Sequence, residues 1–177
     1  VDRDIEEWNM EARRLASFTH ELGIRKEDQG NRIRVDELGE MVNQRTRGWT
    51  LETLGSGALP VVVGGDHAAP FGAITAAAHS HRSLGILHID AHADLRPAYQ
   101  GFTWSHASIF HNVLEAAPSV ERLVSVGLRD LGEGEFKTIE RSGGRIRAVY
   151  DHQRARTANL ELAIAEVGHL PDQVWLG

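Results

Sequence analysis

Short apolar segments alternate with helical segments over most of this chain, and no other feature of the sequence constrains its fold as strongly. Apolar runs occur at residues 61–63, 84–89, 123–126, 145–150 and 173–176. Segments typical of helices lie between them, at residues 72–79, 105–114, 133–141 and 160–167. Strands that alternate with helices form parallel sheets, because right-handed crossovers place a helix over the sheet after each strand. The sequence therefore predicts a three-layer α/β/α fold with a mainly parallel sheet.

Two longer helices are predicted before this alternation begins. Apolar side chains recur at helical spacing over residues 5–22 and 35–54. The chain has 177 residues, and we find no repeat or linker that divides it. We therefore predict that residues 1–177 form a single domain. Since the chain lacks an initiating Met, we expect this domain to be incomplete at its N-terminal end.

Composition argues against several classes of function. The net charge of −6 disfavours nucleic acid as a partner, because phosphate binding needs a basic surface. The absence of cysteine excludes disulfides, thiolate zinc sites and cysteine nucleophiles. The apolar runs are far shorter than the ~20 residues of a membrane helix, and the first residues are not those of a signal peptide. We therefore expect a cytoplasmic location, with neither nucleic acid nor a membrane as partner.

Two motifs of acidic residues and histidine follow consecutive predicted strands. Gly-Gly-Asp-His at residues 64–67 follows the run that ends at residue 63, and Asp-Ala-His-Ala-Asp at residues 90–94 follows the run 84–89. Ligands of open α/β sheets bind outside the carboxyl ends of the strands, which is where both motifs lie. Three ionisable side chains that leave an apolar strand on one face are costly without partners. Together the two motifs predict a metal site.

The spacing of the second motif limits how it could bind metal. Asp90, His92 and Asp94 share one face of an extended chain. At ~3.3 Å per residue the two aspartates would be about 13 Å apart, whereas ligand bonds are only ~2.0–2.2 Å long. Either the chain bends sharply after Asp90, or the three residues serve two ions side by side. If the two predicted strands are neighbours about 4.8 Å apart, His67 completes the cluster.

The ligand set predicted from these motifs contains two imidazoles and two carboxylates, with no sulfur. Its members are His67, Asp90, His92 and Asp94. Mixed oxygen and nitrogen ligation favours Mn²⁺, with Fe²⁺, Co²⁺, Ni²⁺ or Zn²⁺ as alternatives. Two ions that share a carboxylate would hold a bridging water and lower its pKa to form hydroxide near neutral pH.

Two neighbouring residues are expected to be outside the ligand set. His88 shares the face of Asp90 but lies deeper in the strand, so we predict a core histidine with satisfied hydrogen bonds. Asp66 precedes His67 directly, and we predict that it orients the imidazole without ligating.

These motifs resemble those of the ureohydrolase family, which contains arginase, agmatinase and formimidoylglutamase. Besides residues 64–67 and 90–94, the resemblance includes Trp-Ser-His-Ala-Ser at 104–108 and Val-Gly-Leu-Arg-Asp at 126–130. It extends from about residue 51 to the end of the chain. The resemblance implies a three-layer α/β/α fold, a site for two manganese ions, and hydrolysis of C–N bonds in guanidino or formimino groups of a small-molecule substrate.

The resemblance also implies individual roles for residues of these motifs. His67 and Asp94 would ligate one ion and His92 the other, while Asp90 would bridge both. A hydroxide that bridges the ions would attack the substrate carbon, and Asp94 would orient that hydroxide. His106 would protonate the leaving amine, and the loop 95–104 would face the substrate. The family is also compatible with a homo-oligomer.

The chain departs from the family in its third motif, Ser-x-Asp-x-Asp, which supplies two further aspartate ligands. Residues 173–177 resemble the start of the strand that carries this motif, and the aspartates are absent from the sequence. We therefore expect a domain incomplete at both ends, which binds metal poorly and lacks activity as it stands.

Two other interpretations stay open at this stage. A dinuclear metallophosphoesterase also uses Asp-x-His and Gly-Asp motifs, but it needs a subsequent Asn-His motif that this chain lacks. A non-catalytic binding module would keep the sheet without the third ligand pair. Within the ureohydrolase interpretation, arginine, agmatine, other guanidino acids and formiminoglutamate all fit the chemistry.

Overall fold

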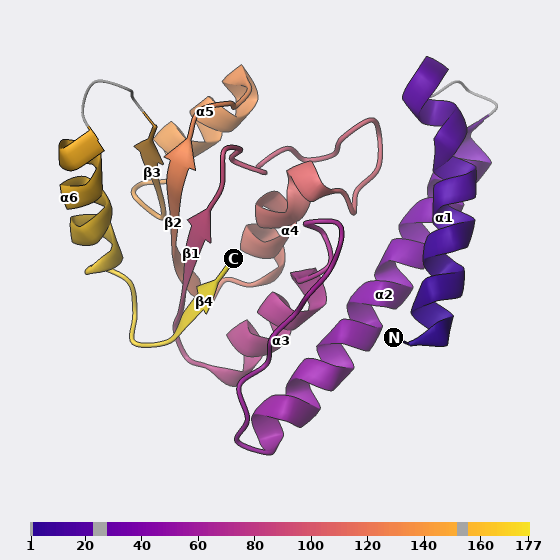
Figure 1. The fold of residues 1–177 in the computed structure, drawn as a ribbon, viewed down its shortest axis with the longest axis horizontal. Helices are drawn as coiled ribbons and strands as arrows, with labels where there is room; N and C mark the ends of the chain where they lie inside the picture. The colour runs from indigo at the N-terminus through magenta and orange to yellow at the C-terminus, as the bar shows by residue number, and fades with distance from the viewer. Residues whose placement is uncertain (1, 23–27, 152–155) are drawn as a thin grey trace.

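The computed structural model describes residues 2–22, 28–151 and 156–177, in which a four-stranded parallel sheet forms the centre of the fold (Figure 1). The strands are β1 (Leu84–Ile89), β2 (Val120–Leu128), β3 (Ile146–Tyr150) and β4 (Val174–Leu176). Their order across the sheet is β3-β2-β1-β4, and every neighbouring pair is parallel. The predicted parallel sheet is confirmed.

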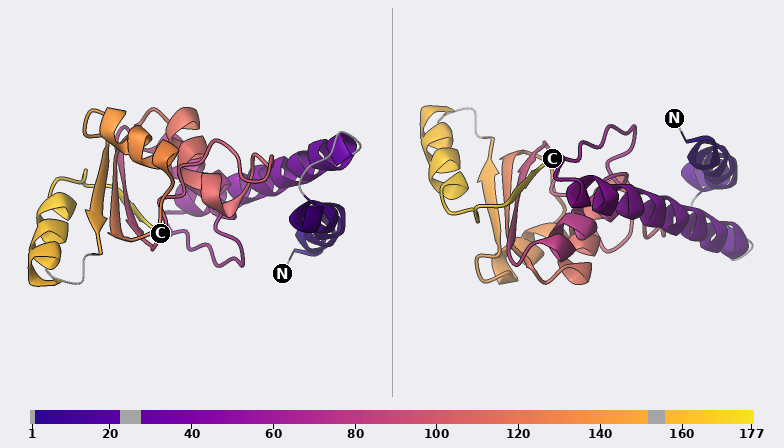
Figure 2. Two further views of the ribbon diagram at one scale, coloured as in Figure 1. Left: turned by 90° about the horizontal axis from the view of Figure 1, so that it is seen from above. Right: turned by 90° about the horizontal axis from the view of Figure 1, so that it is seen from below.

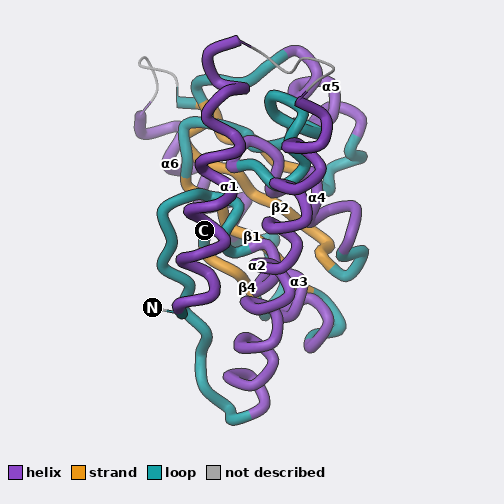
Figure 3. The backbone as a smooth tube through the Cα atoms, turned by 90° about the vertical axis from the view of Figure 1, so that its right-hand side faces the viewer, coloured by secondary structure: helices purple, strands orange, loops and turns teal. Residues whose placement is uncertain are grey.

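Helices cover both faces of the sheet, which gives three layers (Figure 2). One face is covered by α3 (Phe71–Ser80), α4 (Ile109–Ala116) and α5 (Glu133–Arg141), with the short 3₁₀ helix η2 (His106–Ser108) before α4. The other face carries α6 (Arg156–Val167). The long helices α1 (Arg3–Leu22) and α2 (Gln29–Gly55) lie outside α3, in front of the strands in Figure 3. None of the described helices is both long and apolar enough to cross a membrane.

The order of the strands reverses beside β1. From β1 the chain proceeds outward to β2 and β3 through α4 and α5 on one face. It then returns through α6 on the opposite face and adds β4 to the other edge of β1. Ligand sites of open α/β sheets lie at such a reversal, outside the carboxyl ends of the strands. The carboxyl end of β1 is therefore the position that the topology favours for a site.

The residues of β1 change from apolar to polar along one face. Leu84 and Ile86 are buried in the core that the sheet forms with α3, α4 and α5. Because side chains alternate between the faces of a strand, His88 and then Asp90 continue the same face. One face of β1 therefore leads from the hydrophobic core directly into the predicted site.

The predicted strand at residues 61–63 is wrong. Residues 58–64 have no regular secondary structure, and the side chains of Val61 and Val63 are 78% and 92% exposed. A strand requires a partner for its backbone N–H and C=O groups, and both edges of β1 are already paired, with β2 and β4. His67 therefore approaches the end of β1 from a loop and not from a neighbouring strand.

Close packing of α2 against α3 gives a stability prediction for Gly72. A Cβ atom at this position would collide with the carbonyl oxygen of Asn43 and with Thr46 Oγ1. We expect Gly72→Ala to lower the free energy of unfolding by ~1–3 kcal/mol in chemical denaturation, because backbone must move to admit the methyl group. Gly134→Ala in α5 is the matched control, because a Cβ there meets nothing within 4 Å. It should be neutral or stabilise by up to ~1 kcal/mol. Equal effects at both glycines would contradict the packing argument.

Candidate metal centre

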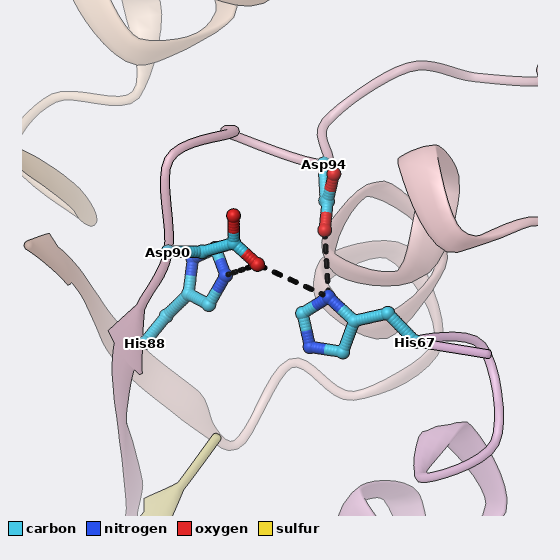
Figure 4. Close-up of side chains that lie close together, drawn as sticks. All are labelled: His67, His88, Asp90 and Asp94. Carbon is cyan, nitrogen blue, oxygen red and sulfur yellow. Dashed lines mark hydrogen bonds and ion pairs between the residues drawn. The ribbon is translucent and has the colours of Figure 1, made fainter. Parts of the chain in front are cut away.

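Four side chains with metal-ligating atoms gather at the carboxyl end of β1 (Figure 4). They are His67, His88, Asp90 and Asp94, and one ligand atom from each lies within 4.8 Å of all the others. His88 and Asp90 come from β1 and its end, Asp94 from the segment that follows, and His67 from the loop before α3. Three separate places in the chain therefore supply this cluster.

A sharp bend after β1 brings Asp94 back to the cluster. The chain first continues beside the end of β2, where the Ala91 carbonyl accepts the backbone N–H groups of Arg129 and Asp130. Asp94 then takes the left-handed conformation, with φ +53°, and its Oδ2 lies 2.7 Å from Nδ1 of His67. Its carboxylate is buried, with 7% of the side chain exposed. The spacing of the motif at residues 90–94 required either a sharp bend after Asp90 or two ions side by side, and the structure contains the bend.

Glu135, which the sequence analysis missed, holds this bend from α5. Its buried carboxylate accepts the N–H of Leu95 at 3.0 Å and the N–H of Gly132 at 2.8 Å. The carbonyl of Asp94 also accepts the N–H of Phe110 at 3.1 Å. The signal for Glu135 was present, because a glutamate at the third position of a helix commonly caps the helix N-terminus. Nothing local indicated that the same carboxylate would reach the residue after Asp94.

Asp90 presents its two carboxylate oxygens to opposite sides. Oδ2 lies 3.9 Å from Nδ1 of His67 and 3.7 Å from Nε2 of His88. Oδ1 accepts the backbone N–H of His92 at 2.9 Å and lies 3.2 Å from its Nδ1. The His92 side chain is 59% exposed and lies outside the four-residue cluster. The four predicted ligands are thus not all on one side of the Asp90 carboxylate. His92 lies beside Oδ1, whereas His67 and Asp94 lie on the side of Oδ2.

His88 is buried, as predicted, but its hydrogen bonds are not all satisfied. Nδ1 lies 3.2 Å from the hydroxyl oxygen of Ser125, whereas Nε2 is buried without a hydrogen-bond partner and faces Asp90. The prediction of satisfied hydrogen bonds is therefore wrong, whereas the prediction that His88 is outside the ligand set stays a prediction. Strand parity alone placed His88 on the face of Asp90, but it did not indicate that Nε2 would reach the carboxylate.

Asp66 and His106 lie beside the cluster. Asp66 accepts the N–H of Ala68 through Oδ1, which closes the turn that carries His67. Its Oδ2 lies 3.7 Å from Nδ1 of His106, whose side chain is half exposed. The predicted role of Asp66 was to orient the imidazole of His67. In the structure its carboxylate instead closes the turn and faces His106.

The loop at residues 95–104 is fixed at its C-terminal end. Asp36 of α2 accepts both the N–H and the hydroxyl of Thr103. The ring of Trp104 packs on Phe71 of α3, with ring centroids 4.7 Å apart. The loop is therefore held by both α2 and α3.

The electrostatics of the cluster differ between its two buried histidines. The hydrogen bond that His67 donates to the Asp94 carboxylate raises the pKa of His67 above its usual value, against the opposing effect of burial. Burial lowers the pKa of His88 to about 4. Burial alone would raise the pKa of Asp90, but the hydrogen bonds from His92 and the nearby imidazoles of His88 and His67 together lower it below its usual value. Near neutral pH, Asp90 is therefore a carboxylate next to a neutral His88.

The donor set fits a divalent cation. Imidazole nitrogens and carboxylate oxygens are the ligands of borderline ions such as Mn²⁺, Fe²⁺, Co²⁺ and Zn²⁺. Two carboxylates held this close to one another repel, and a cation between them would relieve that repulsion. His67, Asp90 and Asp94 could share one ion, while Asp90 and His92 could contribute to a second.

Comparison with known proteins agrees with the fold and the motifs. The model of the arginase family matches residues 5–177. The chain is 33% identical to the N(1)-aminopropylagmatine ureohydrolase of Thermus thermophilus over 138 residues, which are 75% of this chain and 46% of that protein. It is 27% identical to the formimidoylglutamase of Halalkalibacterium halodurans over 151 residues, covering 83% of this chain and 44% of that protein. Among solved structures, arginase from Bacillus cereus superposes with a TM-score of 0.62 at 27% identity, covering 82% of this chain and 54% of that one. The chain spans about half the length of the curated relatives it matches.

The raised pKa of His67 predicts how the stability of the metal-free chain depends on pH. Folding makes this imidazole bind its proton more tightly, so the resulting stabilisation is full below the unfolded pKa of about 6.5. It is lost as the pH rises through the higher pKa of the folded state. We expect the difference in free energy of unfolding between the wild-type chain and His67→Asn to fall as the pH rises above about 6.5. The exposed His79→Asn variant should show no such change, and a flat difference for His67 would contradict the prediction.

The buried position of Glu135 predicts a specific sensitivity to an isosteric change. In Glu135→Gln the amide nitrogen must face one of two backbone N–H groups, so a hydrogen bond becomes a clash of donors. We expect the free energy of unfolding to fall by ~1–3 kcal/mol in chemical denaturation. Glu133→Gln, in the same turn but exposed, is the control and should stay within ~0.5 kcal/mol of the wild type. Similar losses in both variants would contradict the assigned role.

Proposed function

Because this chain belongs to the arginase family, we propose that the whole protein hydrolyses C–N bonds of linear guanidino or formimino compounds with the help of two divalent cations. The observation that carries the proposal is the position of Asp90. One of its oxygens faces His67 and the other faces His92. A carboxylate in this position could bind one ion through each oxygen and so be shared between two ions.

The proposed cation positions lie on the two sides of Asp90. His67, Asp90 and Asp94 would hold the first ion, and Asp90 and His92 would contribute to the second. We propose Mn²⁺ for both positions, since the ligands are oxygen and imidazole nitrogen without sulfur. When bound, such ions supply Lewis-acid activation that lowers the pKa of water.

Two residues of the chain would manage the protons of the reaction. Asp94 would accept a hydrogen bond from the attacking water, orient its oxygen toward the substrate carbon, and take up the proton that the water loses as the C–O bond forms. As the C–O bond forms and the C–N bond breaks, His106 would donate a proton to the leaving nitrogen. The half-exposed position of His106 beside the loop 95–104 supports this role, since its ring stands 5.3 Å from that of Tyr99 in that loop. An imidazole is also the side chain that most often acts as a general acid.

The substrate class is proposed from the shared chemistry of the relatives. The names of the Thermus and Halalkalibacterium proteins refer to an aminopropylagmatine and to formimidoylglutamate, and both contain an amidine-type C–N bond. We propose arginine, agmatine, other guanidino acids and formiminoglutamate as the candidates. We propose that the reaction takes place in the cytoplasm.

The decisive experiment is a substrate panel with the whole protein loaded with Mn²⁺. Urea should be released from one of the guanidino compounds, or formamide from formiminoglutamate, and chelation should abolish the release. A phosphate ester belongs in the same panel, because a dinuclear phosphoesterase would release phosphate instead. If no member of the C–N panel reacts while bound Mn²⁺ is verified, the proposed activity is wrong.

The proposed role of His106 predicts a loss of turnover without a loss of metal. His106→Asn in the whole protein should lower kcat by ~10²–10⁴-fold near neutral pH, because the leaving nitrogen no longer receives a proton from the imidazole. The Mn²⁺ content, measured by elemental analysis, should stay that of the wild type. His169→Asn, an exposed histidine near the start of β4, is the matched control and should leave kcat unchanged. A His106 variant with normal turnover would contradict this assignment.

A further inference from the structure

His88 is a buried histidine to which neither the family resemblance nor the proposed reaction gives a role. Its side chain is 1% exposed, and it lies on β1 in direct register with Ser125 on β2. Because the strands are parallel and paired at these residues, the two side chains project from the same face of the sheet. The ring packs against Phe110 of α4, with centroids 4.5 Å apart. The imidazole is therefore held on several sides and has little freedom to turn.

The hydrogen bonds of this imidazole are only half complete. Nδ1 lies 3.2 Å from the Ser125 hydroxyl oxygen. Nε2 is buried without a hydrogen-bond partner, and the nearest carboxylate oxygen is Oδ2 of Asp90 at 3.7 Å. A buried polar atom without a partner is uncommon and calls for an explanation. A movement of a few tenths of an ångström would bring this pair into hydrogen-bond range.

The surroundings select one tautomer of the ring. If Nδ1 carried the proton, the lone pair of Nε2 would face the negative Asp90 carboxylate and be repelled. If the Ser125 hydroxyl donates to Nδ1, the proton is on Nε2, the ring nitrogen nearest the Asp90 carboxylate. Figure 4 shows the ring of His88 beside this carboxylate. Serine can act as donor or acceptor, so the hydroxyl adapts to the second arrangement.

Asp90 is constrained from its other side as well. Its Oδ1 accepts the backbone N–H of His92 at 2.9 Å. A donor at Oδ2 would therefore leave the carboxylate with one defined orientation, with each oxygen still free to ligate on its remaining lone pair. Donors of this kind around ligating groups orient them and increase metal affinity.

We propose that His88 is a positioning residue that orients the shared carboxylate of Asp90 through a buried Ser125–His88–Asp90 chain of hydrogen bonds. Ser125 donates to Nδ1 of His88, and Nε2–H of His88 donates to Oδ2 of Asp90 when a cation draws the carboxylate into place. His88 does not itself ligate the ion. This inference rests on the proposed metal site. It assigns a role to His88, which lies outside the motifs at residues 64–67 and 90–94.

Nitrogen NMR of the histidine rings in the full chain tests the proposal directly, with diamagnetic Zn²⁺ as the probe. His88 should be the Nε2–H tautomer before and after Zn²⁺ is added, while the ring signals of His67 and His92 shift. If the Nε2 proton of His88 is lost on binding, His88 is a ligand and the proposal is wrong although the metal site stands. If Zn²⁺ shifts none of these rings, the metal site itself is wrong and the proposal falls with it.

Metal affinity of variants provides a second, independent readout. We expect His88→Phe to weaken binding of Mn²⁺ by ~10–100-fold, measured by competition with a chelating dye, because ligands lose a supporting donor. Ser125→Ala should weaken it in the same direction but less, since the ring and its Nε2 proton are still present. His79→Asn, at the exposed end of α3, is the control and should bind as the wild type does. Wild-type affinity in both folded variants would overturn the proposal.

Discussion

The pairing of β1 on both of its edges is the constraint on which the rest of the site depends. At the last residue of the strand, the N–H of Ile89 donates to the carbonyl of Gly177 beyond β4. One residue later, the N–H of Asp90 donates to Val126 of β2 at 3.1 Å. The backbone can therefore not shift at Asp90 without breaking the ladder on one side. Gly127 permits this close approach, because its φ is +94° and a Cβ there would lie 3.2 Å from the Asp90 carbonyl oxygen.

The bend at Asp94 has an energetic cost that contacts from two helices offset. A non-glycine residue at positive φ costs about 1–3 kcal/mol, although aspartate tolerates it better than most. The N–H of Phe110 at the start of α4 binds the Asp94 carbonyl, and Glu135 of α5 binds the next N–H along the chain. These two helices thus determine where the Asp94 carboxylate points, although neither contributes a ligand atom to the four-residue cluster.

Local features of the fold were predictable from the sequence, and features that depend on distant partners were not. The bounds of β1 and α5 agree with the prediction, because a continuous apolar run and an acidic first turn are both visible in consecutive residues. Residues 61–63 have the composition of a strand, but both edges of β1 are taken by β2 and β4, which composition cannot reveal. The motifs suggested that His67, Asp90 and Asp94 lie together, and the structure does bring them together, but through a loop and a bend and not through the ends of two neighbouring strands. The contacts of His88 with Ser125 and of Glu135 with Leu95 join residues 37 and 40 positions apart. The register of β1 against β2 decides the first, and the position of α5 beside the bend decides the second.

The two sides of Asp90 differ in their electrostatics as well as in their residues. On one side the carboxylate of Asp94 is nearly inaccessible and His67 is largely covered, so charges there interact through a medium of low polarity. On the other side His92 and Asp130 are exposed, with 3.8 Å between Nε2 and Oδ2, and salt and water screen their charges. The buried side already stabilises a positive charge, because the pKa of His67 is raised by the Asp94 carboxylate. A cation on that side would replace the proton of His67 and would be attracted by the same Asp94 carboxylate. The two positions beside Asp90 are therefore inequivalent, and this inequivalence follows from the bend, since only the bend buries Asp94 against His67.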